Sequence, residues 1–437
     1  MSSKTKTTAT KEEATPALVP KLRFPEFREA EKWKPITIEE ASTPVTERVG
    51  ERKLTPVSIS AGIGFVPQTE KFGRDISGNQ YQVYTLVRDG DFVFNKGNSL
   101  KFPQGCVYLL QGWGQVAAPN VFICFRLKKG YSNGFFQQCF EQNQHGRELK
   151  RHITSGARSN GLLNISKETF YGVAIPTPNP AEQQKIAECL SSVDELMAAQ
   201  ARKVAALKTH KKGLMQQLFP REGETQPRLR FPEFQNAGEW VSRIGTEITS
   251  KITKGSSPNW QGFSYQTQGV LFVTSENVRD GFLDVSEPKF LPKEFFAKQS
   301  NSHLLCGDIL INIVGASIGR NCVYRLNEPA FTNQAVALFR VTKEHSFEFI
   351  SYCYQQDRSQ KAVSANQSDS ARPNLSLSDL RNMEFLIPSL PEQQRIASCL
   401  TSLDDLIAAQ SQKLESLKTH KKGLMQQLFP SPEEVEA

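Results

Sequence analysis

The chain has 437 residues, of which 38% are hydrophobic and 22% charged, a balance typical of soluble proteins with two or three domains. No apolar run approaches the roughly 20 residues that span a bilayer, and the N-terminus lacks the apolar stretch of a signal peptide. We therefore expect a cytoplasmic protein. The eight cysteines include no CxxC pair, which favours reduced thiols over zinc ligands or disulfides.

Basic residues are concentrated in the first half of the chain. Residues 21–178 contain 21 basic and 14 acidic side chains, a net of +7, whereas residues 227–385 contain 17 and 16, a net of +1. A basic region favours a polyanionic partner, although solubility alone explains the charge equally well.

Two sequence marks each occur twice. The first is KLRFPEF at 21–27 and RLRFPEF at 228–234, each followed six residues later by a tryptophan, Trp33 or Trp240. The second extends over residues 182–220, which match 392–430 at 28 of 39 positions and share the fourteen residues LKTHKKGLMQQLFP. The chain is therefore a tandem of two units. The predicted parts are a disordered tail (1–20), a globular domain (21–178), a helix (179–220), a linker (221–227), a second globular domain (228–387), a second helix (388–430) and an acidic tail (431–437).

The regions between the repeated marks hardly resemble each other, and both have a mixed α/β (α+β) pattern. Short runs rich in β-branched and aromatic residues alternate with Gly, Asn and Pro clusters, as strands and turns do. Strands are predicted within 81–95, 105–110 and 120–127 of the first domain, and within 269–278, 307–314, 321–326 and 335–341 of the second.

The repeated segments have the apolar spacing of a coiled coil. Apolar residues step by four and three from Ile186 to Leu218 and from Ile396 to Leu428, with Gln200 and Gln410 at equivalent polar positions that can fix the register. We expect the two helices to pair antiparallel within the chain, with pseudo-twofold symmetry. Two unrelated surface helices, or a parallel pairing between chains, are the alternatives.

This layout resembles the specificity subunit of type I restriction-modification enzymes over residues 21–430. The resemblance rests on LRFPEF…W, on EQQxIAxxL…LKxxKKGLMQQLF, and on GDILINIVGASIGRNCVY (307–324) followed by FTNQAVALFR (331–340); the first half has only a vague counterpart at 90–108. It implies that each globular region is a target recognition domain for one half of a split double-stranded DNA site. It also implies two methyltransferase subunits that carry S-adenosylmethionine and methylate adenine, and restriction subunits that use ATP and Mg.

Glycine-bearing loops that carry Asn, Ser, Lys and Arg are the candidate DNA contacts. Arginine and asparagine bond to guanine and adenine edges, and lysine bonds to phosphates, although an ordinary solvated turn is the alternative for every loop. Trp260 is expected to pack beside the loop at 254–262. The candidates are Lys96, Asn98, Ser99, Lys101, Arg158, Asn160, Lys254, Ser256, Ser257, Asn259, Arg320, Asn321, Gln367, Ser370 and Arg372.

The repeated KKGLMQQLF is the candidate docking surface, because two equal methyltransferase subunits would need two equal surfaces. A glycine inside a helix costs about 1 kcal/mol relative to alanine, which either close approach by a partner or a helix kink would explain. The docking candidates are Gly213, Leu214, Met215, Leu218 and Phe219, with Gly423, Leu424, Met425, Leu428 and Phe429 as their equivalents; Met215 and Phe219 are preferred because they lie off the seam.

Catalytic motifs are missing from the sequence. The nearest string to a methyltransferase [DN]PP[FYW] loop is NPAE at 179–182, and GASIGRN at 315–321 lacks the lysine of a P-loop. We therefore expect a non-catalytic recognition subunit with no metal or cofactor of its own. The alternatives are a subunit of a methylation-only complex, a self-sufficient modifying enzyme with cryptic motifs, and a coiled-coil adaptor that does not bind DNA.

Overall fold

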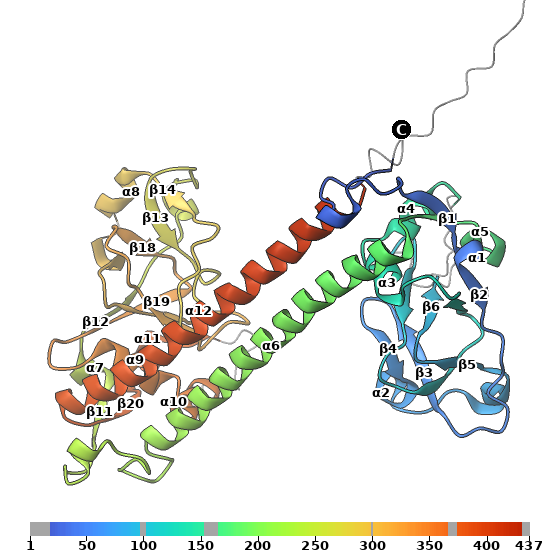
Figure 1. The fold of residues 1–437 in the computed structure, drawn as a ribbon. Helices are drawn as coiled ribbons and strands as arrows, with labels where there is room; N and C mark the ends of the chain where they lie inside the picture. The colour runs from blue at the N-terminus through green and yellow to red at the C-terminus, as the bar shows by residue number, and fades with distance from the viewer. Residues whose placement is uncertain (1–17, 97–101, 153–164, 299, 366–373, 431–437) are drawn as a thin grey trace, which may run out of the picture. The chain divides into compact units, whose positions relative to one another are not determined.

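The computed structural model describes residues 18–96, 102–152, 165–298, 300–365 and 374–430 (Figure 1). The chain divides into two compact units, one formed by residues 1–199 with 414–437 and the other by residues 200–413. Each unit therefore contains one globular domain and parts of both long helices.

Two four-stranded sheets form the first domain. The sheet with strand order β2-β9-β6-β7 is antiparallel, whereas β3 and β8 run parallel in the sheet β4-β3-β8-β5. All residues of β6 are buried, as expected for a strand covered on both faces. The strands are β2 (Ser42–Pro44), β3 (Thr55–Ser60), β4 (Gly64–Pro67), β5 (Thr85–Arg88), β6 (Asp91–Asn95), β7 (Cys106–Leu109), β8 (Gln115–Ala118) and β9 (Ile123–Leu127).

The second domain has the same sheet topology. Its sheets are β12-β19-β16-β17 and β14-β13-β18-β15, with β13 and β18 parallel, so every strand corresponds to the strand numbered ten lower. The strands are β12 (Thr249–Lys254), β13 (Val270–Val273), β14 (Phe290–Leu291), β15 (His303–Leu304), β16 (Ile309–Asn312), β17 (Asn321–Val323), β18 (Ala330–Thr332) and β19 (Val336–Val341). The two domains share one architecture although their sequences hardly resemble each other.

An equivalent ion pair with a buried carboxylate supports both domains. Arg126 on β9 lies 2.6 Å from Asp91 at the start of β6, and Arg340 on β19 lies 2.7 Å from Asp308, which precedes β16. Both carboxylates are almost fully buried, so the charge on each requires its arginine partner.

A two-stranded ribbon joins each domain to its long helix. Strand β1 (Lys34–Thr37) pairs with β10 (Ala174–Thr177), and β11 (Val241–Ile244) pairs with β20 (Glu384–Ile387). The short helices are α1 (Ile38–Ala41), α2 (Gln68–Phe72), α3 (Asn133–Glu141), α4 (Gln144–Lys150) and α5 (Lys167–Tyr171) in the first domain, and α7 (Gly245–Ile248), α8 (Lys293–Lys298), α9 (Phe347–Tyr354), α10 (Asp357–Ala365) and α11 (Leu377–Asn382) in the second.

The long helices are α6 (Pro180–Leu218) and α12 (Leu390–Leu428), close to the predicted ranges. In the second unit Gln200 Nε2 donates to the Gln410 carbonyl (2.8 Å), and Lys211 lies 2.6 Å from Asp404. In the first unit Lys421 lies 2.8 Å from Asp194. Since an early residue of one helix meets a late residue of the other, the predicted antiparallel pairing within the chain is confirmed.

The first repeated mark, LRFPEF with its following tryptophan, binds the start of the long helix that follows its own domain. Arg23 forms two hydrogen bonds with Glu182, at 2.8 and 2.6 Å, and Trp33 Nε1 donates to the same carboxylate at 3.3 Å. Arg230 repeats the bidentate contact with Glu392, at 2.7 Å for both bonds. Bidentate arginine–carboxylate pairs fix orientation as well as charge, which explains why the motif occurs twice.

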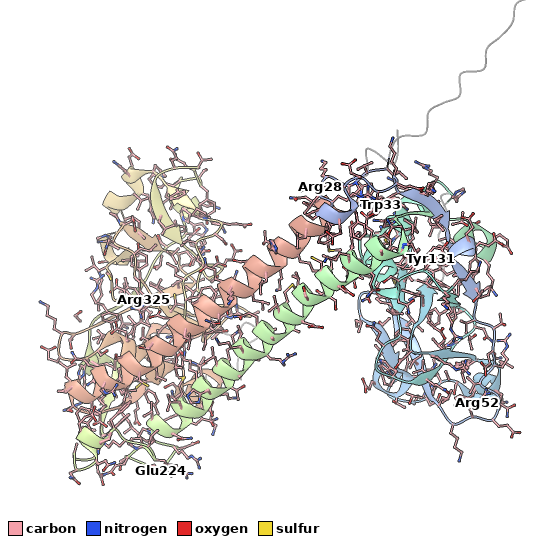
Figure 2. All side chains as sticks on the ribbon, in the orientation of Figure 1. Arg28, Trp33, Arg52, Tyr131, Glu224 and Arg325 are labelled. Carbon is pink, nitrogen blue, oxygen red and sulfur yellow. The ribbon has the colours of Figure 1, made fainter. Side chains whose placement is uncertain are left out.

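The second repeated mark ends inside the hydrophobic core. Phe429 packs against Trp33 and Phe135, with ring centroids 5.9 and 5.5 Å apart, and Figure 2 shows Trp33 near this helix end. In the second unit Phe219 packs in the same way against Trp240 and Phe349, at 6.0 and 5.4 Å. Each helix end is therefore received by an equivalent aromatic pair.

These contacts correct the prediction that the helix ends are exposed docking surfaces. Four of the candidates are core residues: Leu218 (1% exposed), Phe219 (4%), Leu428 (2%) and Phe429 (1%). Leu214, Met215, Leu424 and Met425 are half-buried and pack against the same cores. The duplicated LMQQLF is thus needed because each unit buries one copy.

The repeated glycines differ from their apolar neighbours. A Cβ added at Gly213 or at Gly423 would meet no atom within 4 Å beyond the neighbouring backbone of its own helix, so neither glycine is required by packing inside the chain.

Candidate nucleic-acid interface

A buried asparagine ends the same strand in both domains. Asn312, at the end of β16, donates through Nδ2 to the Ser275 carbonyl (2.9 Å) and to Ser317 Oγ (3.1 Å). Asn95, at the end of β6, donates to the Ile59 carbonyl of β3 (2.7 Å). Each asparagine thereby ties the end of one sheet to the other, so the loops that follow these strands gather at one end of the domain.

The loop 255–262 joins this cluster in the second domain. The Gly255 amide donates to the Asn333 carbonyl (3.2 Å), and the Asn333 amide donates to the Val273 carbonyl (3.0 Å). A Cβ on Gly255 would overlap the Thr332 carbonyl, so only glycine permits this approach. The loop is therefore held against the ends of β13 and β18.

The candidates on this loop differ in exposure. Lys254 and Asn259 are exposed, whereas Ser256 and Ser257 are half-buried, and Ser256 Oγ accepts a hydrogen bond from Gln261 (2.7 Å). Trp260 is 94% exposed, so the expectation that it packs beside the loop is wrong. An exposed indole offers a surface on which a nucleic-acid base can stack.

The hairpin between β16 and β17 carries the next two candidates. Arg320 is partly exposed and lies 3.8 Å from Asp280. This long ion pair leaves the guanidinium available to an anion that approaches it more closely. Asn321 is 2% exposed, and its amide donates to Ser351 Oγ at 2.8 Å. The prediction that Asn321 contacts DNA is therefore wrong, because its side chain is committed to the core.

Other candidates lie outside the described residues. These are Gln367, Ser370 and Arg372 of the second domain, and Asn98, Ser99, Lys101, Arg158 and Asn160 of the first. Asn374 forms a bridge with Val314 of the β16–β17 hairpin. In the first domain Lys96 Nζ donates to the Ile165 carbonyl (3.2 Å). In each domain, residues that border two of the predicted DNA-contacting loops are therefore in contact with each other.

Two further segments of the candidate interface, the β3–β4 turn (60–64) and residues 274–281, are not among the loops predicted from the sequence. Both lie beside the asparagine-tied strand ends. The turn at 60–64 contains no arginine or asparagine, although the two glycines of SAGIG indicate a tight turn. The segment 274–281 begins within the run 269–278 that was predicted as a strand.

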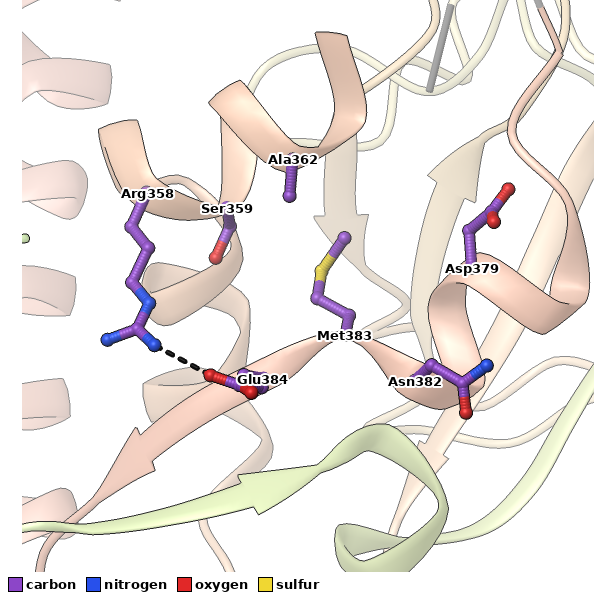
Figure 3. Close-up of a pocket in the computed structure, with 7 residues that line it drawn as sticks. All are labelled: Arg358, Ser359, Ala362, Asp379, Asn382, Met383 and Glu384. Atoms are coloured by element: carbon purple, nitrogen blue, oxygen red, sulfur yellow. Dashed lines mark hydrogen bonds and ion pairs between the residues drawn. The ribbon is translucent and has the colours of Figure 1, made fainter. Parts of the chain in front are cut away.

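A hollow on the second domain does not form part of this cluster. Figure 3 shows it between α10, α11 and β20, with Arg358 paired to Glu384 at 2.7 Å. Asp379 accepts a hydrogen bond from the Ser376 amide (2.8 Å) and so caps α11. The charged groups of the hollow therefore serve the fold.

Two other kinds of feature are absent from the part of the chain that the structure describes. That part contains no group of three His, Cys, Asp or Glu side chains placed to hold a metal ion. Nor does it contain a helix that is long and apolar enough to cross a membrane.

Comparison with known proteins gives a consistent result. Residues 77–209 and 264–419, more than half of the chain, match the family described as Type I restriction modification DNA specificity domain. The type I restriction enzyme MjaVIII specificity subunit of Methanocaldococcus jannaschii is 26% identical over 282 residues, which cover 63% of this chain and 66% of that protein.

Solved structures show the same fold. The S subunit of a type I restriction-modification system from M. genitalium superposes with a TM-score of 0.59 and 15% identity, covering 94% of this chain and 99% of that one. A chain from a study of complex assembly and conformational transition of the type I R-M system gives a TM-score of 0.52 at 18% identity, covering 91% and 97%. The chain therefore belongs to the type I restriction-modification DNA specificity family, and its two globular domains are the DNA target recognition domains of a specificity subunit.

Proposed function

We propose that each half of this chain recognises one part of a bipartite double-stranded DNA site. The observation that carries the proposal is that two domains of identical topology present unlike loops at the same end of their sheets. One scaffold with two different loop sets is suited to reading two different base sequences. The paired helices then fix the number of unread base pairs between the half-sites.

Two methyltransferase subunits dock on the long helices in this proposal. Gly213 and Gly423 support it, because both leave open space that nothing inside the chain fills. Lys212 and Gln216 are exposed, as are the equivalent Lys422 and Gln426. Identical exposed residues at two equivalent places suit two copies of one partner. The buried leucines and phenylalanines are no longer part of this surface.

The chemistry belongs to the partners. The methyltransferase subunits bring S-adenosylmethionine and transfer its methyl group to an adenine in each half-site, while restriction subunits bring ATP and Mg. This chain contributes position only and acts as a non-catalytic recognition subunit.

Co-expression with the methyltransferase subunit, followed by genome-wide mapping of N6-methyladenine, tests the proposal. The expected result is a split motif with two defined parts around a gap of constant length. Exchange of residues 21–178 for those of another specificity subunit should change one half-site and leave the other. A soluble complex that produces no new methylation would contradict DNA recognition and favour a coiled-coil adaptor.

A second experiment separates the two forms of the complex. Restriction of unmethylated phage DNA in cells that carry the complete set of subunits would show that this chain also directs cleavage. Full methylation without restriction would identify a methylation-only complex.

A further inference from the structure

An apolar side chain stands at the tip of the β3–β4 turn in the first domain. Ile63 is 75% exposed, and its amide donates to the Ser60 carbonyl (3.0 Å), which closes the turn. The neighbouring Gly62 amide donates to Tyr108 Oη on β7 (2.6 Å). The turn is therefore held in place against β7, and it presents isoleucine to solvent.

The corresponding connection in the second domain, between β13 and β14, also has an apolar tip. Val278 and Leu283 form a bridge, and the Arg279 amide donates to the Phe282 carbonyl (3.0 Å), so the segment is a small hairpin. Phe282 at this tip is 60% exposed.

The two tips are anchored to corresponding strands, although through different groups. The Gly281 amide donates to the Asn321 carbonyl on β17 (2.9 Å), and β17 corresponds to β7, which holds Gly62 in the first domain. Both tips also follow a strand whose end is tied by the buried asparagine of β6 or β16. Two connections of different length and sequence thus place an apolar side chain at the same position of the fold.

A single exposed apolar residue is common on protein surfaces and carries little information. Recurrence at one topological position, in two domains that otherwise differ in sequence, is more informative. Charges flank the second tip: Arg279 lies 3.3 Å from Asp284, and Arg320 reaches Asp280 from the β16–β17 hairpin. In such an arrangement the apolar side chain can contact a base while the neighbouring arginines contact the flanking phosphates.

We propose that Ile63 and Phe282 pack against the bases of the half-site that their own domain reads, each at one base step. Isoleucine and phenylalanine are side chains that proteins insert between base pairs, and apolar groups also pack on the 5-methyl group of thymine. This inference rests on the proposed recognition of DNA by both domains.

The test uses the complex of the full chain with its methyltransferase subunits and duplexes that carry the mapped site. Ile63→Ala and Phe282→Ala are compared with Phe72→Ala and Val241→Ala, whose side chains are 45% and 52% exposed. Phe72 follows β4 and lies at the opposite end of the β3–β4 pair from the turn. All four residues are exposed, so thermal unfolding should change little.

The tip variants should each weaken DNA binding by about tenfold, a loss similar to that caused by one mismatched base pair in a recognition site. Ile63→Ala should relax base preference in one half-site only, and Phe282→Ala in the other. Replacement of adenine by 2-aminopurine, and of thymine by deoxyuridine, at successive positions should locate the contact as a fluorescence change or an affinity loss that the tip variant abolishes.

Two failures are distinguishable. If the wild-type complex neither binds nor methylates a split site, the proposed function fails. If the wild-type complex does both while the tip variants bind and discriminate as wild type, or lose no more than the control variants, the function stands and this inference is overturned.

Discussion

Phe219 stacks on Phe349 with ring centroids 5.4 Å apart, as Phe429 stacks on Phe135 at 5.5 Å. Each contact joins the end of one long helix to the domain from which the other long helix begins. The receiving ring lies on α9 or α3, the corresponding helices of the two domains. The helix end and the phenylalanine that packs against it are therefore duplicated together, because each unit needs both to complete its core.

Truncation of a stacked phenylalanine should destabilise the chain. Phe219→Ala and Phe429→Ala remove almost fully buried rings, and each is expected to lower the free energy of unfolding by about 3–5 kcal/mol. Urea unfolding followed by tryptophan fluorescence measures the change, because Trp240 and Trp33 are in contact with these rings. Gln216→Ala and Gln426→Ala, at exposed positions of the same repeats, are the controls.

A different result would restore the docking interpretation. If Phe219→Ala unfolds like the wild type but no longer binds the methyltransferase subunit, the side chain serves the partner instead of the core.

The two long helices and their pairing were predicted from the sequence, because the heptad spacing shows directly which helix positions face the partner helix. The sequence also predicted the strands with unbroken apolar runs, such as β6 and β16. It did not predict β3, because the segment Thr55–Ser60 contains a proline and three hydroxyl-bearing residues and reads as a loop. Parallel pairing of β3 with β8 depends on contacts between distant segments, which local patterns do not record.

The candidate interface was only partly predictable for the same reason. Asn95 and Asn312 determine which loops meet, yet an asparagine in a sequence indicates a turn and not a buried tie between sheets. The heptads showed that the helix ends are apolar but not what covers them. The sequence did contain one signal of what covers them: Trp33 and Trp240 belong to the repeated LRFPEF…W motif, which is duplicated together with the helix ends.

Substitution of the helical glycines should separate stability from assembly. Gly213→Ala and Gly423→Ala meet no neighbouring atom, so each should stabilise the isolated chain by roughly 0.5–1 kcal/mol. If a methyltransferase subunit approaches closely there, the added methyl group should weaken assembly of the complex. Thermal unfolding and co-purification of the subunits measure the two effects, with the exposed Thr209→Ala as control. Stabilisation with unchanged assembly would show that these glycines do not serve docking.

Removal of the exposed indole should affect DNA binding and not folding. Trp260 is 94% exposed, so Trp260→Ala should leave the unfolding midpoint unchanged. Base–aromatic stacking contributes about 1–3 kcal/mol, and binding of DNA should therefore weaken by roughly tenfold. Duplex DNA should quench the fluorescence of the wild-type complex more than that of the variant. Trp113→Ala, at a 39% exposed position of the first domain, should retain the quenching; equal quenching in both variants would argue against stacking by Trp260.

Stability of the first domain should fall in mild acid because of His145. This side chain is 1% exposed between the rings of Phe94 and Phe140, at 6.1 and 5.6 Å, and burial lowers its pKa to about 4. In the unfolded chain the histidine pKa is about 6.5, so between these values the unfolded state binds a proton that the folded state does not. Stability is therefore lost as pH falls through this window, by about 2 kcal/mol at pH 5.

Urea unfolding at pH 7 and pH 5 measures this loss. His145→Leu removes the titrating group and should flatten the dependence on pH, even if its stability at pH 7 is lower. His345 in the second domain also has a pKa lowered by burial, so His345→Gln is the matched control and should keep most of the dependence. An equal loss of stability between pH 7 and pH 5 in the wild type and in His145→Leu would show that other groups set the acid sensitivity.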